Sequence, residues 1–104
     1  MSMSEAKRPI VSWREKRMEK VMKAFDNYEE TVFQDGVLDS KTKEIIATVT
    51  SGIMRCEHCT EVHLKNALAK GATKDQIAEA IAVAMVTAGG NQAYWTDVFQ
   101  KLLD

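Results

Sequence analysis

Residues 54–71 read MRCEHCTEVHLKNALAKG, and this stretch holds every cysteine and every histidine of the 104-residue chain. These four side chains are Cys56, His58, Cys59 and His63. Side chains three, four or seven positions apart share one face of an α-helix, so Cys56, Cys59 and His63 should point the same way. His58 lies about 100° away from Cys59 around the helix axis and belongs to a flanking surface. The stretch therefore predicts a helix, from about Cys56 to Lys70, with three reactive groups on one face.

The sequence on either side of this stretch also shows helical spacing. Residues 12–36 predict one helix, with Ser12 and Glu15 in a capping box and Gly36 as the stop. Its apolar residues recur at three- and four-residue steps, namely Met18, Val21, Phe25, Tyr28 and Val32. Residues 38–55 predict a second helix that begins at Asp39 or Ser40 as N-cap. The whole pattern is typical of an all-α protein.

Two more helices are predicted after Gly71, which suits the end of the reactive helix. Thr73 and Gln76 form a capping box that opens a helix over residues 74–90. The part of this helix from Ala80 to Gly90 carries no charge, so it should be buried on every side. A chain of 104 residues can hardly surround it alone, which predicts an interface between subunits. The last helix falls in residues 91–104, where Tyr94 and Trp95 should serve the core or an interface.

The chain as a whole is expected to form one domain. Residues 1–11 are polar and predict a flexible N-terminal segment, and residues 12–104 predict a single helical domain. We expect a compact bundle of about five to six helices that assembles through its apolar helices.

Composition excludes several classes of partner. Fourteen Lys and Arg balance fifteen Asp and Glu, so neither nucleic acid nor a membrane surface is expected to bind. No apolar run is long enough to cross a bilayer, and the first ten residues lack the apolar core of a signal peptide. These features predict a cytoplasmic protein. In that compartment two neighbouring cysteines are more often catalytic or metal-binding than structural.

Thiol chemistry explains the reactive stretch best. The nucleophile is the thiolate, and both cysteines fall at the start of a helix, where the macrodipole favours negative charge. An imidazole one turn away, at His63, can accept the proton of Cys59 and should lower its pKa below the usual value of about 8.5. One sulfur could attack a peroxide or a disulfide, and the other could resolve the product.

Two other interpretations of the stretch remain open. Both cysteines could be small buried hydrophobic residues, although two histidines at matching spacing would then be coincidental. They could also bind zinc with His63, but a closed structural site needs a fourth ligand. Glu44 or a neighbouring subunit would have to supply it. The sequence therefore favours a redox dithiol over a metal site.

The reactive residues, taken with Glu44, resemble a known family. They read E-x(11)-C-x-H-C-x(3)-H, which is similar to the active-site signature of alkylhydroperoxidase D-like proteins in the carboxymuconolactone decarboxylase superfamily. The following segment, KNALAKGATKDQIAEAIAVAMVTAGGNQAYW, is similar as well, so the resemblance covers about residues 37–96. It implies an all-helical fold that forms homo-oligomers, either trimers or hexamers. It also implies a peroxidase or disulfide oxidoreductase without a cofactor or a metal.

The resemblance also implies a role for each residue. Cys59 would be the peroxidatic sulfur, Cys56 the resolving one and His63 the proton acceptor. Glu44 would join His63 in a proton relay, and His58 would be a supporting polar group. By itself, a glutamate in the first turn of a helix is explained by the dipole, so only the family spacing gives Glu44 a role. A dithiol such as a lipoyl-type group would reduce the disulfide.

Two alternatives in other functional classes are kept. Some members of the superfamily are lactone decarboxylases, which are expected to work without this cysteine pair. The second alternative is a non-enzymatic metal-binding module.

Overall fold

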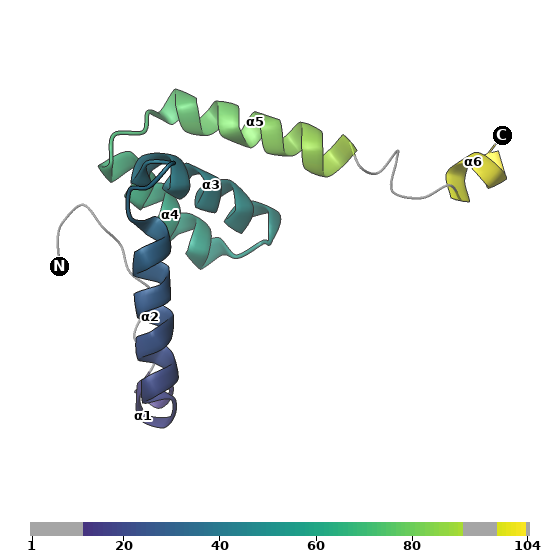
Figure 1. The fold of residues 1–104 in the computed structure, drawn as a ribbon. Helices are drawn as coiled ribbons and strands as arrows, with labels where there is room; N and C mark the ends of the chain where they lie inside the picture. Colours follow the sequence, from purple (N-terminus) through teal and green to yellow (C-terminus); the bar gives the residue numbers. More distant parts are fainter. Residues whose placement is uncertain (1–11, 91–97, 104) are drawn as a thin grey trace.

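The computed structural model describes residues 12–90 and 98–103, and within them all regular structure is helical. The predicted all-α class is therefore confirmed. The described residues contain six helices: α1 (Ser12–Arg17), α2 (Glu19–Phe33), α3 (Ser40–Ile53), α4 (Glu57–Ala69), α5 (Lys74–Gly90) and α6 (Val98–Leu103). Figure 1 shows α3 and α4 side by side, with α5 on one side of them and α2 extending away from them on the other.

The single helix predicted over residues 12–36 is wrong in its extent. Met18 leaves the helical region, with φ −131° and ψ 39°, and separates α1 from α2. Backbone hydrogen bonds from Met18 to Arg14 and from Met22 to Met18 still connect the two pieces. Ser12 is the first residue of α1 and not its cap, and α2 ends at Phe33, before Gly36. Periodicity could not reveal the break because the apolar spacing continues through Met18.

The second predicted helix is confirmed in α3, and its beginning has a clear cause. Asp39 is the N-cap, and its side chain accepts a hydrogen bond of 2.7 Å from the backbone N–H of Thr42. This bond supplies a partner for an N–H group that the helix itself leaves without one. A hydrogen bond from the side chain of Thr42 lowers the pKa of Asp39 most, this backbone bond lowers it further, and the positive charge of Lys41 adds a smaller effect in the same direction.

A tight turn joins α3 to α4 and places the cysteines. The N–H of Arg55 bonds to the carbonyl of Gly52, and the N–H of Cys56 bonds to the carbonyl of Ser51. This pair of bonds is the Schellman motif, which normally has glycine at the position that Arg55 occupies. Arg55 adopts φ 57°, in the left-handed region. Only this one residue separates the C-cap of α3, Met54, from the N-cap of α4, Cys56.

The end of α4 repeats the same motif with the expected residue. Gly71, at φ 100°, donates its N–H to the carbonyl of Leu68, and Ala72 donates to that of Ala67. The predicted stop at Gly71 is thus confirmed. The next helix opens on the predicted capping box, because Thr73 and Gln76 exchange side-chain to backbone hydrogen bonds of 3.0 Å each.

The described core is small and lies where α3, α4 and α5 meet. Ala67, Ala72 and Ile77 form its centre, and Ile45 and Leu64 pack against it. The radius of gyration is 17.7 Å, whereas a compact chain of this length has about 13 Å. Much of α2 and α5 extends beyond this core, as Figure 1 shows.

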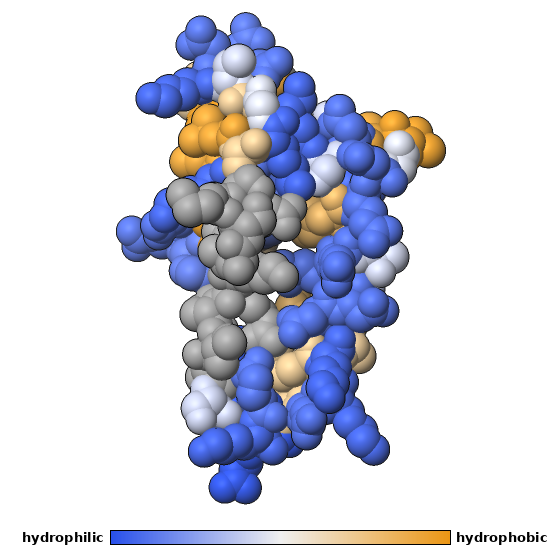
Figure 2. Space-filling model, turned by 90° about the vertical axis from the view of Figure 1, so that its left-hand side faces the viewer, coloured by the Kyte–Doolittle hydropathy of each residue, from blue (hydrophilic) through white to orange (hydrophobic). Residues whose placement is uncertain are grey.

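Apolar side chains on two helices remain exposed in the single chain. On α5 they are Ile81, Val83, Met85 and Val86, and on α2 they are Val21, Phe25, Tyr28 and Val32. Met22, and not the predicted stripe, is the buried residue of α2. Figure 2 shows apolar patches that interrupt an otherwise hydrophilic face. The predicted subunit interface stays a prediction, and Tyr94 and Trp95 lie outside the described residues.

Within residues 12–90 and 98–103, no helix combines the length and the hydropathy needed to cross a membrane. The predicted flexible segment, residues 1–11, falls outside these ranges, and the domain division stays a prediction.

Candidate active site

Cys56 begins helix α4 and is bonded to Cys59. It is the N-cap of the helix, and its Sγ accepts the backbone N–H of Cys59 at 3.2 Å. The two residues form a disulfide, so the described state is the oxidised one. The carbonyl oxygen of Cys56 accepts the N–H and the hydroxyl of Thr60, each at 2.9 Å. The first turn of the helix thus holds Cys56 through three hydrogen bonds.

His63 lies on the same helix and pairs with Glu44 of α3. Nδ1 of His63 is 2.8 Å from Oε2 of Glu44, across nineteen residues of sequence. The side chain of Glu44 is 5% exposed and that of His63 is 17% exposed. An ionised carboxylate only accepts hydrogen bonds, so this contact is completed when the imidazole carries its proton on Nδ1. The other ring nitrogen, Nε2, is then available as a base whenever the ring is neutral.

Two further buried polar residues surround Glu44, and the sequence did not predict either. Asn66 of α4, 6% exposed, places Nδ2 3.4 Å from Oε1 of Glu44. Thr48 of α3, 4% exposed, donates its hydroxyl to the backbone carbonyl of Glu44 at 2.7 Å. Asn66 could have been found from the sequence, because it follows His63 by three positions and shares its helical face.

Phe33, the last residue of α2, covers the imidazole of His63. The two rings stack with their centroids 5.2 Å apart and their planes 19° from parallel. The ring of Phe33 therefore excludes water from one face of the base. No local pattern could have predicted this contact, because Phe33 lies thirty residues before His63 on another helix.

His58 occupies a different surface, as predicted from its position around the helix axis. It is exposed, and its influence falls on Glu61 of the same helix. Lys65 donates to Glu61 at 2.8 Å and holds the pKa of Glu61 below its ordinary value, and His58 adds a smaller effect in the same direction. The structure thus pairs His63 with Glu44 and joins Cys56 to Cys59 at the start of the same helix, whereas His58 contacts none of these groups in the described hydrogen bonds. Its supporting role stays a prediction.

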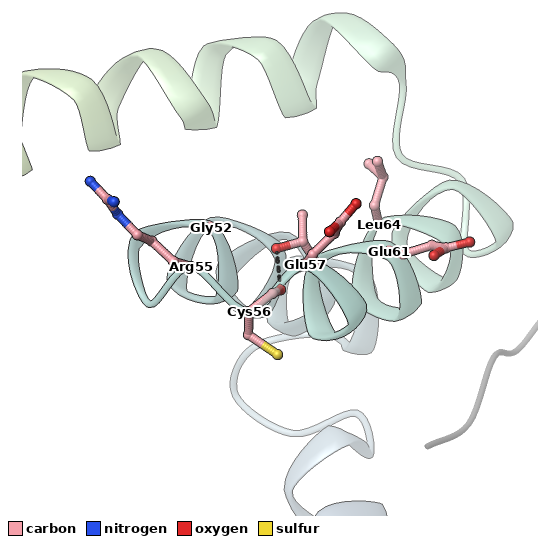
Figure 3. A pocket seen from close by; sticks show the side chains of 7 residues that line it. Gly52, Arg55, Cys56, Glu57, Glu61 and Leu64 are labelled. Carbon is pink, nitrogen blue, oxygen red and sulfur yellow. Dashed lines mark hydrogen bonds between the residues drawn. The ribbon is translucent and has the colours of Figure 1, made fainter. Parts of the chain in front are cut away.

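A groove of about 480 Å³ lies on the other side of α4 from the sulfur of Cys56. Its lining consists of Gly52, Arg55, Cys56, Glu57, Thr60, Glu61 and Leu64. In Figure 3 the side chains of Arg55, Glu57 and Leu64 point toward α5, whereas the sulfur of Cys56 points away from them. The sulfur of Cys56 thus points away from the other side chains that line the groove.

The alternative of a metal site requires at least three carboxylate, imidazole or thiol groups close together. Among the residues that the structure describes, no three carboxylate, imidazole or thiol groups lie close enough together to hold a metal ion.

Comparison with known proteins finds a family for most of the chain. The profile of the carboxymuconolactone decarboxylase family matches residues 19–97. An uncharacterised protein of the cox locus of Paracoccus denitrificans is 46% identical over 61 residues, which is 59% of this chain and 55% of that protein. An uncharacterised protein of Cupriavidus necator is 34% identical over 74 residues, covering 71% of this chain and 66% of its own length.

A third relative is named as an enzyme. The alkyl hydroperoxide reductase AhpD of Corynebacterium aurimucosum is 45% identical over 56 residues. The match covers 54% of this chain but only 32% of that protein. Against the first curated relative the chain spans about half the length, so the similarity concerns a segment and not the whole of these proteins.

The fold has counterparts among solved structures. A crystal structure of a carboxymuconolactone decarboxylase family protein from Thermotoga maritima superposes with a TM-score of 0.62 and 37% identity, over 65% of this chain and 70% of that one. A second crystal structure from the same organism gives a TM-score of 0.63 and 35% identity, over 72% and 70%.

Proposed function

The chain belongs to the carboxymuconolactone decarboxylase family, and from this membership we propose that it is a thiol-dependent hydroperoxide reductase of the AhpD type. One observation carries the proposal: the Cys56–Cys59 pair shares helix α4 with His63, whose Nδ1 is fixed by the buried carboxylate of Glu44. A dithiol, a base and a group that orients the base are the parts that nucleophilic thiol catalysis requires. The similarity to the AhpD of Corynebacterium aurimucosum supports the same activity.

The first step consumes the peroxide. In the reduced protein, Nε2 of His63 takes the proton of the Cys59 thiol, and the thiolate attacks the terminal oxygen of the hydroperoxide. A sulfur–oxygen bond forms, the oxygen–oxygen bond breaks, and the proton on His63 passes to the departing alkoxide. The products are an alcohol and the sulfenic acid of Cys59. Glu44 stabilises the imidazolium between the two proton transfers.

The second step closes the disulfide. The thiol of Cys56 attacks the sulfenic sulfur, and hydroxide leaves with the thiol proton as water. This step yields the Cys56–Cys59 bond of the described state. Because Cys56 is an N-cap, its sulfur lies beside the N–H of Cys59, so only a short movement separates the two sulfurs. A dithiol reductant, such as a lipoyl-type group, then exchanges twice with the disulfide and is itself oxidised.

The activity is tested by peroxide consumption in the presence of a dithiol reductant. We expect both Cys59→Ser and Cys56→Ser to abolish turnover, and only the Cys56→Ser variant to trap a sulfenic acid, visible by mass. Serine at position 56 can still cap α4, so this variant should keep the fold. Full activity in both variants would refute the proposal.

The same variants separate this reaction from lactone decarboxylation. Decarboxylation would survive the loss of both sulfurs, whereas peroxide reduction would not. The single experiment therefore needs two substrates, a hydroperoxide and a carboxylated lactone, with the double serine variant as the decisive protein.

A further inference from the structure

Glu44 presents two carboxylate oxygens to α4, and each meets a different side chain. Oε2 lies 2.8 Å from Nδ1 of His63, and Oε1 lies 3.4 Å from Nδ2 of Asn66. The two partners are three residues apart on one face of α4. The carboxylate is therefore held at two points, and its plane cannot turn about the side-chain axis without losing one contact.

The position of Asn66 gives it more than a packing role. Its amide is almost fully buried, so its polar atoms need hydrogen-bond partners, and Glu44 is one of them. An apolar residue would fill the same space without needing such partners, as Ala67 does next to it. The Asn66 amide also has donor hydrogens to offer, and the group that it faces, Glu44, accepts only. A distance of 3.4 Å is long for a hydrogen bond, and such contacts shorten when a site engages its substrate.

We propose that Asn66 is a positioning residue, which orients the carboxylate of Glu44 so that Nδ1 of His63 keeps the proton and Nε2 stays free for Cys59. The inference rests on the proposed function, in which His63 serves Cys59. Asn66 itself touches neither the sulfurs nor the substrate. Glu44 from α3 and Phe33 from α2 contact the imidazole of His63.

The first test uses the oxidised protein and needs no peroxide. Nitrogen-15 NMR distinguishes the two neutral forms of an imidazole, and the chain has only two histidines. His58 is exposed and serves as the internal reference. At about pH 9, above the ordinary histidine range, His63 should carry its proton on Nδ1. In Asn66→Leu the ratio of the Nδ1–H to the Nε2–H form should fall by about threefold to tenfold, the effect of one lost hydrogen bond.

Two further variants make the result decisive. Asn66→Ala removes the same amide without adding volume, so it replaces Asn66→Leu if leucine disturbs the fold. We expect the same fall in the ratio of the Nδ1–H to the Nε2–H form. Val62→Ala removes a buried side chain from the same helix and should leave the ratio as in the wild type. An unchanged ratio in both Asn66 variants would overturn the proposal, and so would an equal fall in Val62→Ala.

The second test connects Asn66 to the sulfur. In a Cys56→Ser background, we expect Asn66→Leu to slow alkylation of Cys59 at pH 7 by about threefold, since a net hydrogen bond has about this effect. His63→Ala in the same background tests the base itself. If His63→Ala slows alkylation and Asn66→Leu does not, the Asn66 proposal fails and the proposed function stands. If His63→Ala has no effect either, the proton relay of the proposed function fails.

Discussion

The imidazole of His63 is the residue on which the proposed chemistry depends most. Replacing His63 with alanine removes the base, and we expect kcat/KM for a hydroperoxide to fall about 100-fold, at the low end for general base catalysis. Glu44→Gln leaves the base but weakens its orientation, so the loss should be smaller, about tenfold. Steady-state kinetics with a fixed dithiol reductant measures both.

His58 provides the matched control for this series. It is the other histidine, it lies on the same helix, and it is exposed. His58→Ala should change kcat/KM less than about threefold, because a substitution at an exposed site away from the sulfurs has little effect. A loss as large as that of His63→Ala would give His58 the supporting role that the family resemblance suggests.

Arg55 offers a test of backbone strain beside the site. A side chain at φ 57° costs about 1 kcal/mol relative to glycine, and the equivalent position after α4 is Gly71. We expect Arg55→Gly to stabilise the protein by about 1 kcal/mol and Gly71→Ala to destabilise it by a similar amount. Urea unfolding at equilibrium measures both. The same sign for the two variants would show that the strain argument is wrong.

The sequence predicted some of these residues and could not predict others. Spacing alone predicts Cys56, Cys59 and His63 on one face, because a helix fixes that relation locally, and the structure has Cys59 and His63 within α4 and Cys56 as its N-cap. It could not show that Glu44 pairs with His63, since that contact crosses between two helices, and only the family spacing suggested it. The stacking of Phe33 on His63 has no local signal at all.

At the scale of the helices, the cap of α3 predicts a response to acid. Hydrogen bonds from Thr42 hold the pKa of Asp39 below its usual value. A depressed pKa in the folded state contributes stability that is complete above the unfolded value, about 3.9, and is lost as pH falls through the folded one. Asparagine in Asp39→Asn still caps the helix but does not ionise. The loss of stability at low pH that comes from Asp39 should therefore be absent in this variant. Melting temperatures of both proteins from pH 6 down to 2 measure it; parallel curves would contradict the assignment.

Helix boundaries followed the sequence wherever a cap or a glycine marked them. Asp39, the Thr73–Gln76 box and Gly71 all lie where the pattern placed them. The failure came at Met18, where an apolar residue continues the helical spacing while its backbone departs from helix. Periodicity reports which side chains share a face, and it contains no information about a local change in φ and ψ.

For the whole molecule, the exposed apolar surface of α5 predicts self-association. Val86 is 73% exposed and Met85 is 70% exposed on a helix without charge from Ala80 onward. We expect light scattering to give a mass that is a multiple of the 11.7 kDa chain, with three or six chains per assembly. Val86→Glu should shift the mass toward one chain, because burying a charge without a partner is costly.

The control variant is Glu79→Gln, which changes a charge on the polar part of the same helix. It should leave the mass of the assembly in light scattering unchanged. A wild-type protein that remains a single chain at all concentrations would contradict the prediction. Composition shows how much apolar surface a chain has, but not whether the same chain or another copy covers it.

The turn between α3 and α4 has a consequence for how the sequence can change. With Arg55 as the single residue between the two caps, the turn has no slack to absorb an insertion. One residue added within α3 after Glu44 would rotate everything that follows by about 100° and displace it by about 1.5 Å relative to Glu44. His63 would then face away from Glu44 while every side chain of the site remained present. The number of residues between Glu44 and Cys56 therefore fixes how His63 is oriented toward Glu44. Homologues should tolerate substitutions in this interval far better than insertions or deletions.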